Sequence, residues 1–449
     1  MPIVQCGANQ RGAVERNDHT EGVVKKVLVL LLLLVSPGRA GADPVIDWNE
    51  TALSAAFAAN LDNLTFGCND ALHESRIMAM MHVAIHDALN AIDRRYQPYA
   101  FDGHAPDASP DAAVAAAAHD VLVATYPRLP GEIGLTPDAA INLVEAAYAT
   151  ALAAIPDGSA KSEGIRIGRA AAAAIVALRA HDNAELPFIV DSYVPGSDPG
   201  DFQFIPGFGP VVAAPYWGQV TPFVLRSSSQ YQPKAPYEVS SKKYAADFNE
   251  VKSLGATDST SRTQDQTEIA YFWVEGAPQG WNRIARAMAV ERGLDPWENA
   301  RLFGLLNLAS ADAYIADFEN KYFYEFWRPI TAVRAGETDG NSDTIGDPNW
   351  MSEMEIGPVP EYPSGHSGQG GAMSTVLARF FGDRISFSTT STMAPGATRA
   401  FTSFSEAAVE NGNSRIYVGF HFRHAVTEGI KLGTKVGTVT FNHYLRPVQ

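Results

Sequence analysis

Cysteine is almost absent from this chain, which has only Cys6 and Cys68 among its 449 residues. Cys6 lies ahead of an apolar leader segment that we expect to be removed, and Cys68 is then left without a partner. An internal disulfide in the mature chain is therefore excluded, and so is a metal site built from cysteines.

Basic residues are scarce relative to acidic ones. The chain has 34 Lys and Arg against 50 Asp and Glu, which gives a formal net charge of −16. Nucleic acids and anionic membrane surfaces both attract a basic face, so this charge balance argues against either as a partner. Any anion that the protein binds must be held by a local cluster of cations.

Long hydrophobic runs are missing outside the first 42 residues. Lys25 and Lys26 precede the apolar run 27–35, and small residues follow at Ala40 and Ala42. This order is typical of a secretory signal peptide that is cut after Ala42. The run is too short for a membrane-spanning helix, which needs ~20 residues, and no later stretch approaches that length. We therefore expect a secreted or periplasmic mature protein without a membrane span.

Helical periodicity, in contrast, is abundant. Apolar residues recur at helical spacing in ten segments: 74–92, 111–126, 137–155, 163–181, 242–254, 264–276, 281–293, 297–327, 365–382 and 424–445. Residues 186–237 are instead rich in Pro, Gly and aromatics, which predicts a long irregular connection. We predict an all-α fold, with two helical bundles in one compact unit.

Three separated segments combine cations with hydrogen-bonding groups. They are "KYFYEFWRP" with Lys321 and Arg328, "YPSGHSG" with Ser364, Gly365 and His366, and "NSRIYVGFHFRHA" with Arg415 and His421. Guanidinium forks and an ammonium suit a tetrahedral oxyanion, and a helix N-terminus adds N–H donors. The two histidines remain for bonding the central atom and for moving protons. By itself, the first segment is more simply a helix end with snorkelling cations.

The ordered triple K-x6-RP, PSGH and SR-x5-H resembles the family of vanadium-dependent haloperoxidases and type 2 phosphatidic acid phosphatases. The likeness to the haloperoxidase branch extends through "DAYIADFENKYFYEFWRPITAVR" and "PVPEYPSGHSGQGGAM" and, more loosely, over most of residues 240–440. It implies a vanadium chloroperoxidase-like helical fold and a vanadate cofactor whose site phosphate can also occupy. It also implies hydrogen peroxide and halide as substrates, and leaves open a small organic substrate and a homo-oligomer.

Carried over position by position, the resemblance implies a role for each residue. His421 would bond vanadium, or attack phosphorus in a phosphatase. The residues that would hold the equatorial oxygens are Lys321, Arg328, Ser364, Gly365 and Arg415. Lys321 would also polarise peroxide, and His366 would take its proton or protonate the leaving alkoxide of a phosphate ester. Glu275, in "YFWVEG", would pair with Arg415, whose buried charge is otherwise uncompensated. The aromatics of "KYFYEFWRP" would exclude water around the cations.

Two positions depart from the family's usual pattern. The aspartate that commonly lies four residues after the last histidine, and orients its ring, is Ala425 here. A phosphatase relies on that carboxylate to make the histidine nucleophilic, so its loss favours the peroxidase interpretation. Seven residues before His366 lies Val359, where the family's members with known halide preference have other residues, so the halide cannot be inferred from it.

Residues 1–42 are thus predicted as the signal peptide, 43–240 as an N-terminal helical region and 241–449 as the C-terminal catalytic region. We predict a vanadate-dependent haloperoxidase that oxidises halide with hydrogen peroxide to a hypohalous acid. The alternatives are an acid phosphatase with a phosphohistidine intermediate and a non-catalytic exported oxyanion-binding protein.

Other candidate sites have simpler explanations. Ser364 lacks the G-x-S-x-G elbow of a serine nucleophile. His82 and His86 lie one helical turn apart without the Glu of an H-E-x-x-H motif, so hydrogen-bonded core histidines are the better interpretation. The acid-rich segment 339–347 breaks the EF-hand spacing and is predicted to be a solvated loop.

Overall fold

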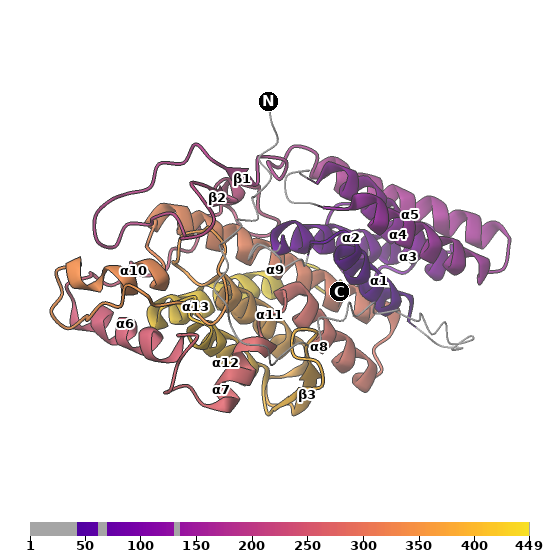
Figure 1. Cartoon of the computed structure of the whole chain (residues 1–449). Coiled ribbons are helices and arrows are strands. Elements are labelled where there is room, and N and C mark those ends of the chain that lie inside the picture. The colour runs from indigo at the N-terminus through magenta and orange to yellow at the C-terminus, as the bar shows by residue number, and fades with distance from the viewer. Residues whose placement is uncertain (1–42, 62–69, 130–134, 449) are drawn as a thin grey trace, which may run out of the picture. The chain divides into compact units, whose positions relative to one another are not determined.

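This computed structural model describes residues 43–61, 70–129 and 135–448 (Figure 1). Several of its helices begin where a capping side chain precedes an apolar pattern. Asp43 and Ser109 are two such caps, because their side chains accept hydrogen bonds from backbone amides of the first helical turn. The predicted signal peptide and Cys68 lie outside the described residues. None of the helices in the described ranges is long and apolar enough to cross a membrane.

The N-terminal helices are α1 Pro44–Ala58, α2 Ala71–Ile92, α3 Pro110–Thr125, α4 Pro137–Ala153 and α5 Ser159–Leu178, with a short 3-10 turn η2 Tyr126–Arg128. Helices α2, α3 and α5 pack against one another, and α4 packs on α1 and α3. The four helices predicted from periodicity are confirmed. The sequence analysis missed α1, although an Asp-Pro pair is a strong helix start signal.

The connection between the two groups of helices is irregular, as predicted. It contains two short strands, β1 Ile189–Val190 and β2 Val212–Ala213, which pair antiparallel, and the 3-10 turn η4 Trp217–Gln219. Its last part is held by Asp312, whose buried carboxylate accepts hydrogen bonds from the backbone amides of Phe223, Val224 and Leu225 at 2.6–2.8 Å. This contact fixes the connection against the longest C-terminal helix.

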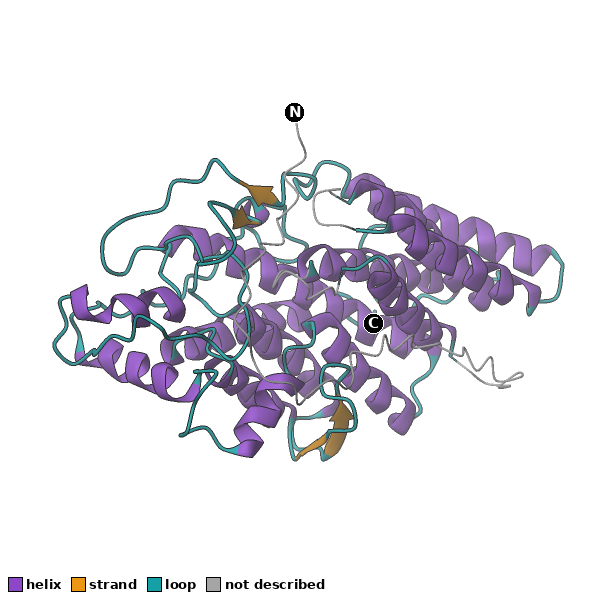
Figure 2. Cartoon of the chain, viewed as in Figure 1, coloured by secondary structure: helices purple, strands orange, loops and turns teal. Residues whose placement is uncertain are grey.

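The C-terminal elements are α6 Lys242–Leu254, α7 Gln264–Phe272, α8 Ala277–Arg292, α9 Pro296–Tyr324, α10 Pro329–Ala335, η5 Gly336–Thr338, α11 Gly365–Phe381, α12 Phe404–Tyr417 and α13 Arg423–His443. An antiparallel hairpin of β3 Phe387–Thr390 and β4 Thr398–Phe401 lies between α11 and α12. Figure 2 shows that helices dominate and that strands are confined to small pairs. The sequence analysis missed α10, α12 and the hairpin, but the all-α class is correct.

The end of α9 differs from its predicted position in a way that matters for the site. The predicted helix 297–327 ends at Tyr324, and Glu325 follows in the left-handed region with φ 45°. Arg328 is extended, because the ring of Pro329 disfavours helical backbone in the residue before it. Lys321 is therefore on a helix, whereas Arg328 is the N-cap residue of α10.

Close packing of α11 on α13 positions the start of α11. Glycines recur every four residues on α13 at Gly429, Gly433 and Gly437, facing α11. A Cβ at Gly433 would lie 1.9 Å from the carbonyl oxygen of Gly368, so only glycine permits this backbone approach. The first turn of α11 is thereby held at a fixed place beside α13.

The apolar core is continuous between the predicted N-terminal and C-terminal regions. Buried side chains of α2 and α3 belong to the same cluster as those of α9 and α11. A second cluster, around Tyr244, Trp327, Trp350 and Phe422, lies near the C-terminal end of α9. The described residues thus belong to one compact unit, and the boundary at residue 240 stays a prediction.

Candidate active site

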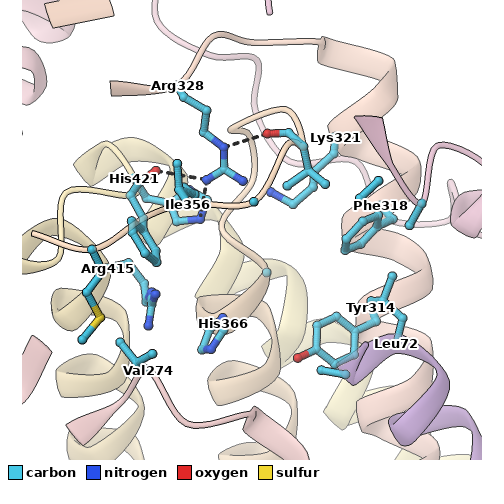
Figure 3. A pocket seen from close by; sticks show the side chains of 18 of the residues that line it. Leu72, Val274, Tyr314, Phe318, Lys321, Arg328, Ile356, His366, Arg415 and His421 are labelled. Carbon is cyan, nitrogen blue, oxygen red and sulfur yellow. Dashed lines mark hydrogen bonds between the residues drawn. The ribbon is translucent and has the colours of Figure 1, made fainter. Parts of the chain in front are cut away.

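The predicted oxyanion-binding residues converge on one cavity of about 380 Å³ (Figure 3). Its lining includes Lys321, Arg328, Gly365, His366, Arg415 and His421. They come from the end of α9, the N-cap of α10, the first turn of α11, the end of α12 and the loop before α13. Ser364 is the N-cap residue of α11 and is fully buried beside them. The fold therefore brings all three sequence segments together.

Lys321 enters the cavity from the last turn of α9. Its ammonium donates hydrogen bonds to the carbonyl oxygens of Pro360, Glu361 and Pro363 at 3.1, 3.0 and 2.5 Å. Burial, and after it the positive charge of Arg328, lowers the pKa of Lys321 to about 7. Lys321 therefore fastens the loop before α11 to α9, in addition to bringing a cation to the cavity wall.

Arg328 links the wall to His421. Its Nε donates to the carbonyl oxygen of Val359 at 2.7 Å, and its Nη1 donates to that of Phe420 at 3.1 Å. The same Nη1 lies 3.2 Å from His421 Nε2. Since a guanidinium only donates hydrogen bonds, His421 Nε2 is the acceptor and carries no proton. The unprotonated Nε2 of His421 thus lies among the cations of the cavity, and its electron pair accepts the hydrogen bond from Arg328.

The N-terminus of α11 supplies neutral donors. Ser364 makes no capping hydrogen bond to its own helix, and its Oγ accepts from Ser367 Oγ at 2.8 Å. The hydroxyl proton of Ser364 is therefore available for another acceptor. The amides of the first turn, including that of Gly365, have no acceptor within the helix. Together with the helix dipole, these groups favour an anion at this end of α11.

His366 faces the cavity from the first turn of α11, as Figure 3 shows. Its Nε2 has no hydrogen-bond partner among the residues that the structure describes. Burial lowers the pKa of His366 well below 6.5, and the charge of Arg415 adds to this effect. A neutral ring with a free nitrogen can accept a proton from a molecule in the cavity.

Arg415 is buried without the partner that the sequence predicted. Its Nη1 donates to the carbonyl oxygen of Trp273 at 2.9 Å, and its guanidinium lies 5.0 Å from the ring centroid of Phe420. Its Nε has no hydrogen-bond partner in the described part of the chain. Burial, and to a smaller extent the charge of Arg328, lowers the pKa of Arg415 to about 9. Arg415 thus retains donor capacity for a bound anion.

The predicted pair of Glu275 with Arg415 is wrong. Glu275 instead receives hydrogen bonds from Arg283 at 2.5 and 2.8 Å, and from the backbone amide and hydroxyl of Thr392. The physical reason is local, because Glu275 precedes α8 and Arg283 projects back to it from the second turn of that helix. Glu275 therefore supports the start of α8 and the loop that contains Thr392.

The sequence analysis missed the carboxylate of Glu361. This side chain is fully buried, and its Oε1 lies 2.9 Å from His421 Nδ1 and 3.0 Å from the backbone nitrogen of Phe422. The pKa of Glu361 is raised to about 8, because burial raises it more than the nearby charge of Arg328 lowers it. The only signal in the sequence was an acid three residues before Ser364, within the otherwise uncharged stretch "PVPEYPSGH".

The aromatics of "KYFYEFWRP" do not form the wall of the cavity. Phe323 is 61% exposed, and the hydroxyls of Tyr322 and Tyr324 donate to backbone carbonyls of the long connection. Trp327 packs in the core beside Tyr244. The prediction that this segment excludes water from the cations is therefore wrong for Phe323, and the other aromatics hold neighbouring loops in place.

Apolar side chains from both halves of the chain line the rest of the cavity. They are Leu72, Phe188, Val274, Phe318, Met354, Ile356, Val359, Met393 and Phe420, with Ala71, Ala213 and Ala214. The N-terminal region therefore contributes directly to the wall, whereas every predicted cationic group lies between residues 321 and 421. Cationic and apolar groups thus share the lining; we call the part around Lys321, Arg328, Arg415 and His421 the cationic end and the remainder the apolar end.

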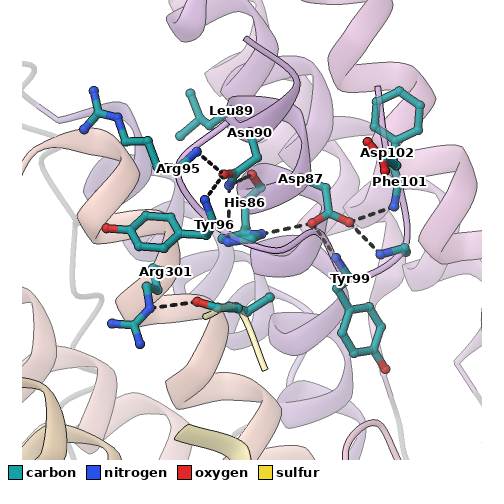
Figure 4. Close-up of polar contacts among 12 residues, drawn as sticks. His86, Asp87, Leu89, Asn90, Arg95, Tyr96, Tyr99, Phe101, Asp102 and Arg301 are labelled. Carbon is teal, nitrogen blue, oxygen red and sulfur yellow. Dashed lines mark hydrogen bonds and ion pairs between the residues drawn. The ribbon is translucent and has the colours of Figure 1, made fainter. Parts of the chain in front are cut away.

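His82 and His86 are structural, in agreement with the simpler interpretation. His82 is fully buried, its Nε2 lies 2.8 Å from Asn49 Nδ2, and burial lowers its pKa to about 3. His86 Nδ1 lies 2.9 Å from Asp87 Oδ1, and His86 Nε2 lies 3.2 Å from Asn90 Nδ2 (Figure 4). In the acid-rich loop 339–347, Asp339 accepts from Thr344 and Asn341. The loop also bonds Asn249 and Lys252 of α6 and the backbone of Val239. No group of three or more His, Cys, Asp or Glu able to hold a metal occurs within the described ranges.

We expect the carboxylate of Asp87 to contribute strongly to the stability of the fold, although Asp87 does not line the cavity. Its carboxylate accepts hydrogen bonds from the backbone amides of Tyr99, Ala100 and Phe101 at 2.7–2.9 Å (Figure 4). We expect Asp87→Ala to lower the free energy of unfolding by roughly 3 kcal/mol or more, because each buried N–H left without an acceptor costs about 1–3 kcal/mol. Urea unfolding measures this change. The control Asp102→Ala removes an exposed ion pair with Arg94. A decrease in its free energy of unfolding above about 1 kcal/mol would contradict the account.

Comparisons with known proteins agree with this geometry. A family model described as the VCPO second helical-bundle domain matches residues 301–449. Vanadium chloroperoxidase from Curvularia inaequalis is 29% identical over 205 residues, which cover 38% of this chain and 33% of that protein. The chain thus spans about a third of the length of this curated relative.

Solved structures extend the similarity over nearly the whole chain. The first bacterial vanadium-dependent iodoperoxidase has a TM-score of 0.74 and 25% identity, and covers 90% of this chain and 98% of its own. The apo and holo forms of a bacterial vanadium-dependent chloroperoxidase each have a TM-score of 0.65 at 17% identity. They cover 84% and 85% of this chain and 94% of their own, and show that the fold is shared. The chain is therefore similar to vanadium-dependent haloperoxidases in sequence over residues 301–449 and in fold over most of its length.

The residues at the cationic end fit vanadate. A tetrahedral oxyanion needs several hydrogen-bond donors, and Arg415 Nε is a buried donor with no partner among the described residues. The central metal needs a neutral nitrogen, and His421 Nε2 is unprotonated, so a bound metal would replace Arg328 as the partner of its electron pair. Arg328, Ser364 and Gly365 add further donors, and Lys321, whose N–H groups donate to three backbone carbonyls, adds a positive charge. A bound vanadate would supply a centre able to activate hydrogen peroxide without an electron carrier.

Proposed function

We propose that this protein is a vanadate-dependent haloperoxidase that oxidises halide with hydrogen peroxide to a hypohalous acid. The observation that carries the proposal is the position of a buried guanidinium, Arg415, in the same cavity as the unprotonated Nε2 of His421. Arg415 forms no ion pair with any carboxylate of the described residues. A bound oxyanion would compensate its charge, because a buried cation without a counter-charge is costly.

Each residue then has a part in the proposed reaction. Arg328, Arg415 and the amides at the start of α11 hold oxyanion oxygens. Lys321 places a positive charge where hydrogen peroxide gains negative charge, and His366 receives the proton that peroxide loses. The apolar end of the cavity keeps water from the cations, so that each charge acts at low dielectric. A small apolar organic acceptor fits the same end, and we propose it as the site of such a molecule.

An acid phosphatase is the second candidate, and one observation favours it. A phosphohistidine route needs a carboxylate behind the nucleophile, and Glu361 Oε1 lies 2.9 Å from His421 Nδ1. The sequence argument that Ala425 disfavours this chemistry therefore loses its force. Phosphate and vanadate have the same tetrahedral shape, so both chemistries would use one cage.

We also propose export of the protein, on the basis of the predicted leader.

The test is an assay of protein from Asp43 onward, stripped of phosphate and incubated with or without orthovanadate. Oxidation of iodide, bromide and chloride by hydrogen peroxide is followed together with hydrolysis of nitrophenyl phosphate. Vanadate-dependent oxidation of any halide supports the proposal. Ester hydrolysis that vanadate blocks, without halide oxidation, makes the protein a phosphatase. Vanadate binding with neither activity makes it an oxyanion-binding protein.

Competition by phosphate provides a further prediction. Inorganic phosphate should raise the apparent Kd for vanadate in proportion to its concentration, because both anions need the same donors on Arg328, Arg415 and α11. The measurement is equilibrium dialysis of vanadate at several phosphate concentrations, with chloride at equal ionic strength as the control. A Kd for vanadate that phosphate does not change would contradict a shared cage.

A further inference from the structure

The carboxylate behind His421 comes from a part of the chain that sequence reasoning did not connect with it. Glu361 lies in the loop before α11, whereas His421 lies in the loop before α13. Glu361 Oε1 accepts from the backbone amide of Phe422 at 3.0 Å and lies 2.9 Å from His421 Nδ1. The backbone of its loop is fastened to Lys321 through three carbonyl oxygens. The carboxylate is therefore held at both its side chain and its backbone.

The direction of the hydrogen bonds follows from the chemistry of the partners. Arg328 can only donate, so the ring nitrogen that faces it, His421 Nε2, must accept. A neutral imidazole with an acceptor at Nε2 carries its proton on Nδ1. That proton points at Glu361 Oε1, which accepts it. The contacts on the two sides of the ring thus agree on one tautomer.

A second position could supply the same carboxylate. Ala425 is fully buried, and it lines a small cavity together with Glu361, Phe422 and Tyr244. The backbone amide of Ser364 donates to the carbonyl oxygen of Ala425 at 3.2 Å, which joins the loop of Glu361 to the first turn of α13. A carboxylate introduced at position 425 would therefore enter the space beside Glu361.

We propose that Glu361 is the positioning residue for His421: it holds the imidazole in the Nδ1–H tautomer and directs the electron pair of Nε2 into the cationic end of the cavity. This inference rests on the proposed function, because it assigns His421 as the ligand of the bound oxyanion's central atom. The carboxylate that commonly lies at the position of Ala425 on α13 would then be replaced by Glu361 from the loop before α11. The ring of His421 thus keeps a carboxylate partner.

The experiment measures binding of orthovanadate alone, without peroxide or halide, to the chain from Asp43 onward. Equilibrium dialysis gives the Kd, and the ⁵¹V NMR shift of the bound ion reports on the vanadium–histidine bond. We expect Glu361→Ala to raise the Kd about 10- to 100-fold, which is typical of lost hydrogen bonds to a metal-bound histidine. Glu361→Gln, which keeps an acceptor oxygen, should raise it less. The double variant Glu361→Ala with Ala425→Asp should recover part of the affinity and return the NMR shift towards that of the unmodified protein.

Controls separate positioning from simple loss of structure. Glu428→Gln alters a buried glutamate on α13 that bonds Lys431 and the backbone of Lys234 outside the cavity, and it should leave the Kd unchanged. If Glu361→Ala does not fold, Glu361→Gln carries the test. Folded Glu361 variants with unchanged Kd and NMR shift would overturn the inference. Unmodified protein that binds no vanadate overturns both proposals, and binding without halide oxidation overturns the proposed function alone.

Discussion

His421→Ala is expected to reduce vanadate-dependent halide oxidation to background. The substitution removes the nitrogen proposed to bond the metal, so the loss should exceed the ~10²–10³-fold effect of removing a single oxyanion donor. The cavity keeps Arg328, Arg415 and Lys321, and an anion can still be attracted to it weakly. The measurement is the initial rate of iodide or bromide oxidation with and without added orthovanadate.

A matched control for this variant is His119→Ala. His119 lies on α3, stacks on Tyr148 and pairs with Asp120, away from the cavity. Its removal should leave the rate unchanged while testing for general effects of losing a partly buried histidine. Vanadate-dependent oxidation that persists in His421→Ala at the unmodified rate would rule out His421 as the ligand.

Lys321→Ala is expected to lower turnover by ~10²-fold or more, by analogy with the loss of one oxyanion donor. Vanadate binding should weaken but stay measurable, because the two guanidiniums remain. Lys321 also fastens the loop of residues 360–363 to α9, so part of the loss would come from a loosened loop.

Two further measurements distinguish the loss of the charge from the loosening of the loop. Lys321→Arg keeps the charge, and should retain vanadate affinity better than Lys321→Ala does. Saturation with hydrogen peroxide separates kcat from KM, and a role in polarising peroxide predicts a loss in kcat at saturating vanadate. An unchanged kcat in Lys321→Ala would show that the lysine only supports the loop.

Local sequence patterns predicted the helices and the cage because both depend on features within short segments. Helical spacing located α2 to α5 and α11 and α13, and three ordered motifs contained every cation that lines the cavity. The predicted end of α9 at Trp327 lies three residues beyond Tyr324, because Glu325 takes a left-handed backbone that the apolar pattern does not reveal. The steric effect of Pro329 on Arg328 is local, and the predicted helix stopped before Arg328 in agreement with it.

Side-chain pairing could not be predicted in the same way, because it depends on which segments the fold places together. The carboxylate of Glu361 meets His421 across 60 positions of sequence, and no spacing rule connects them. Glu275 was assigned to Arg415 by resemblance, but Arg283, eight positions away, lies closer to it in the fold. The apolar lining of the cavity also depends on tertiary packing, because Leu72 and Phe188 come from the N-terminal half of the chain.

The central claim is that the cationic end of the cavity holds vanadate on His421. A crystal structure of the chain from Asp43 onward, soaked in orthovanadate, tests it most directly. The account predicts anomalous density for vanadium bonded to His421 Nε2, with its oxygens contacted by Arg328, Arg415 and the first turn of α11. Vanadium bound elsewhere, or a cavity without vanadium at saturating vanadate, would contradict it.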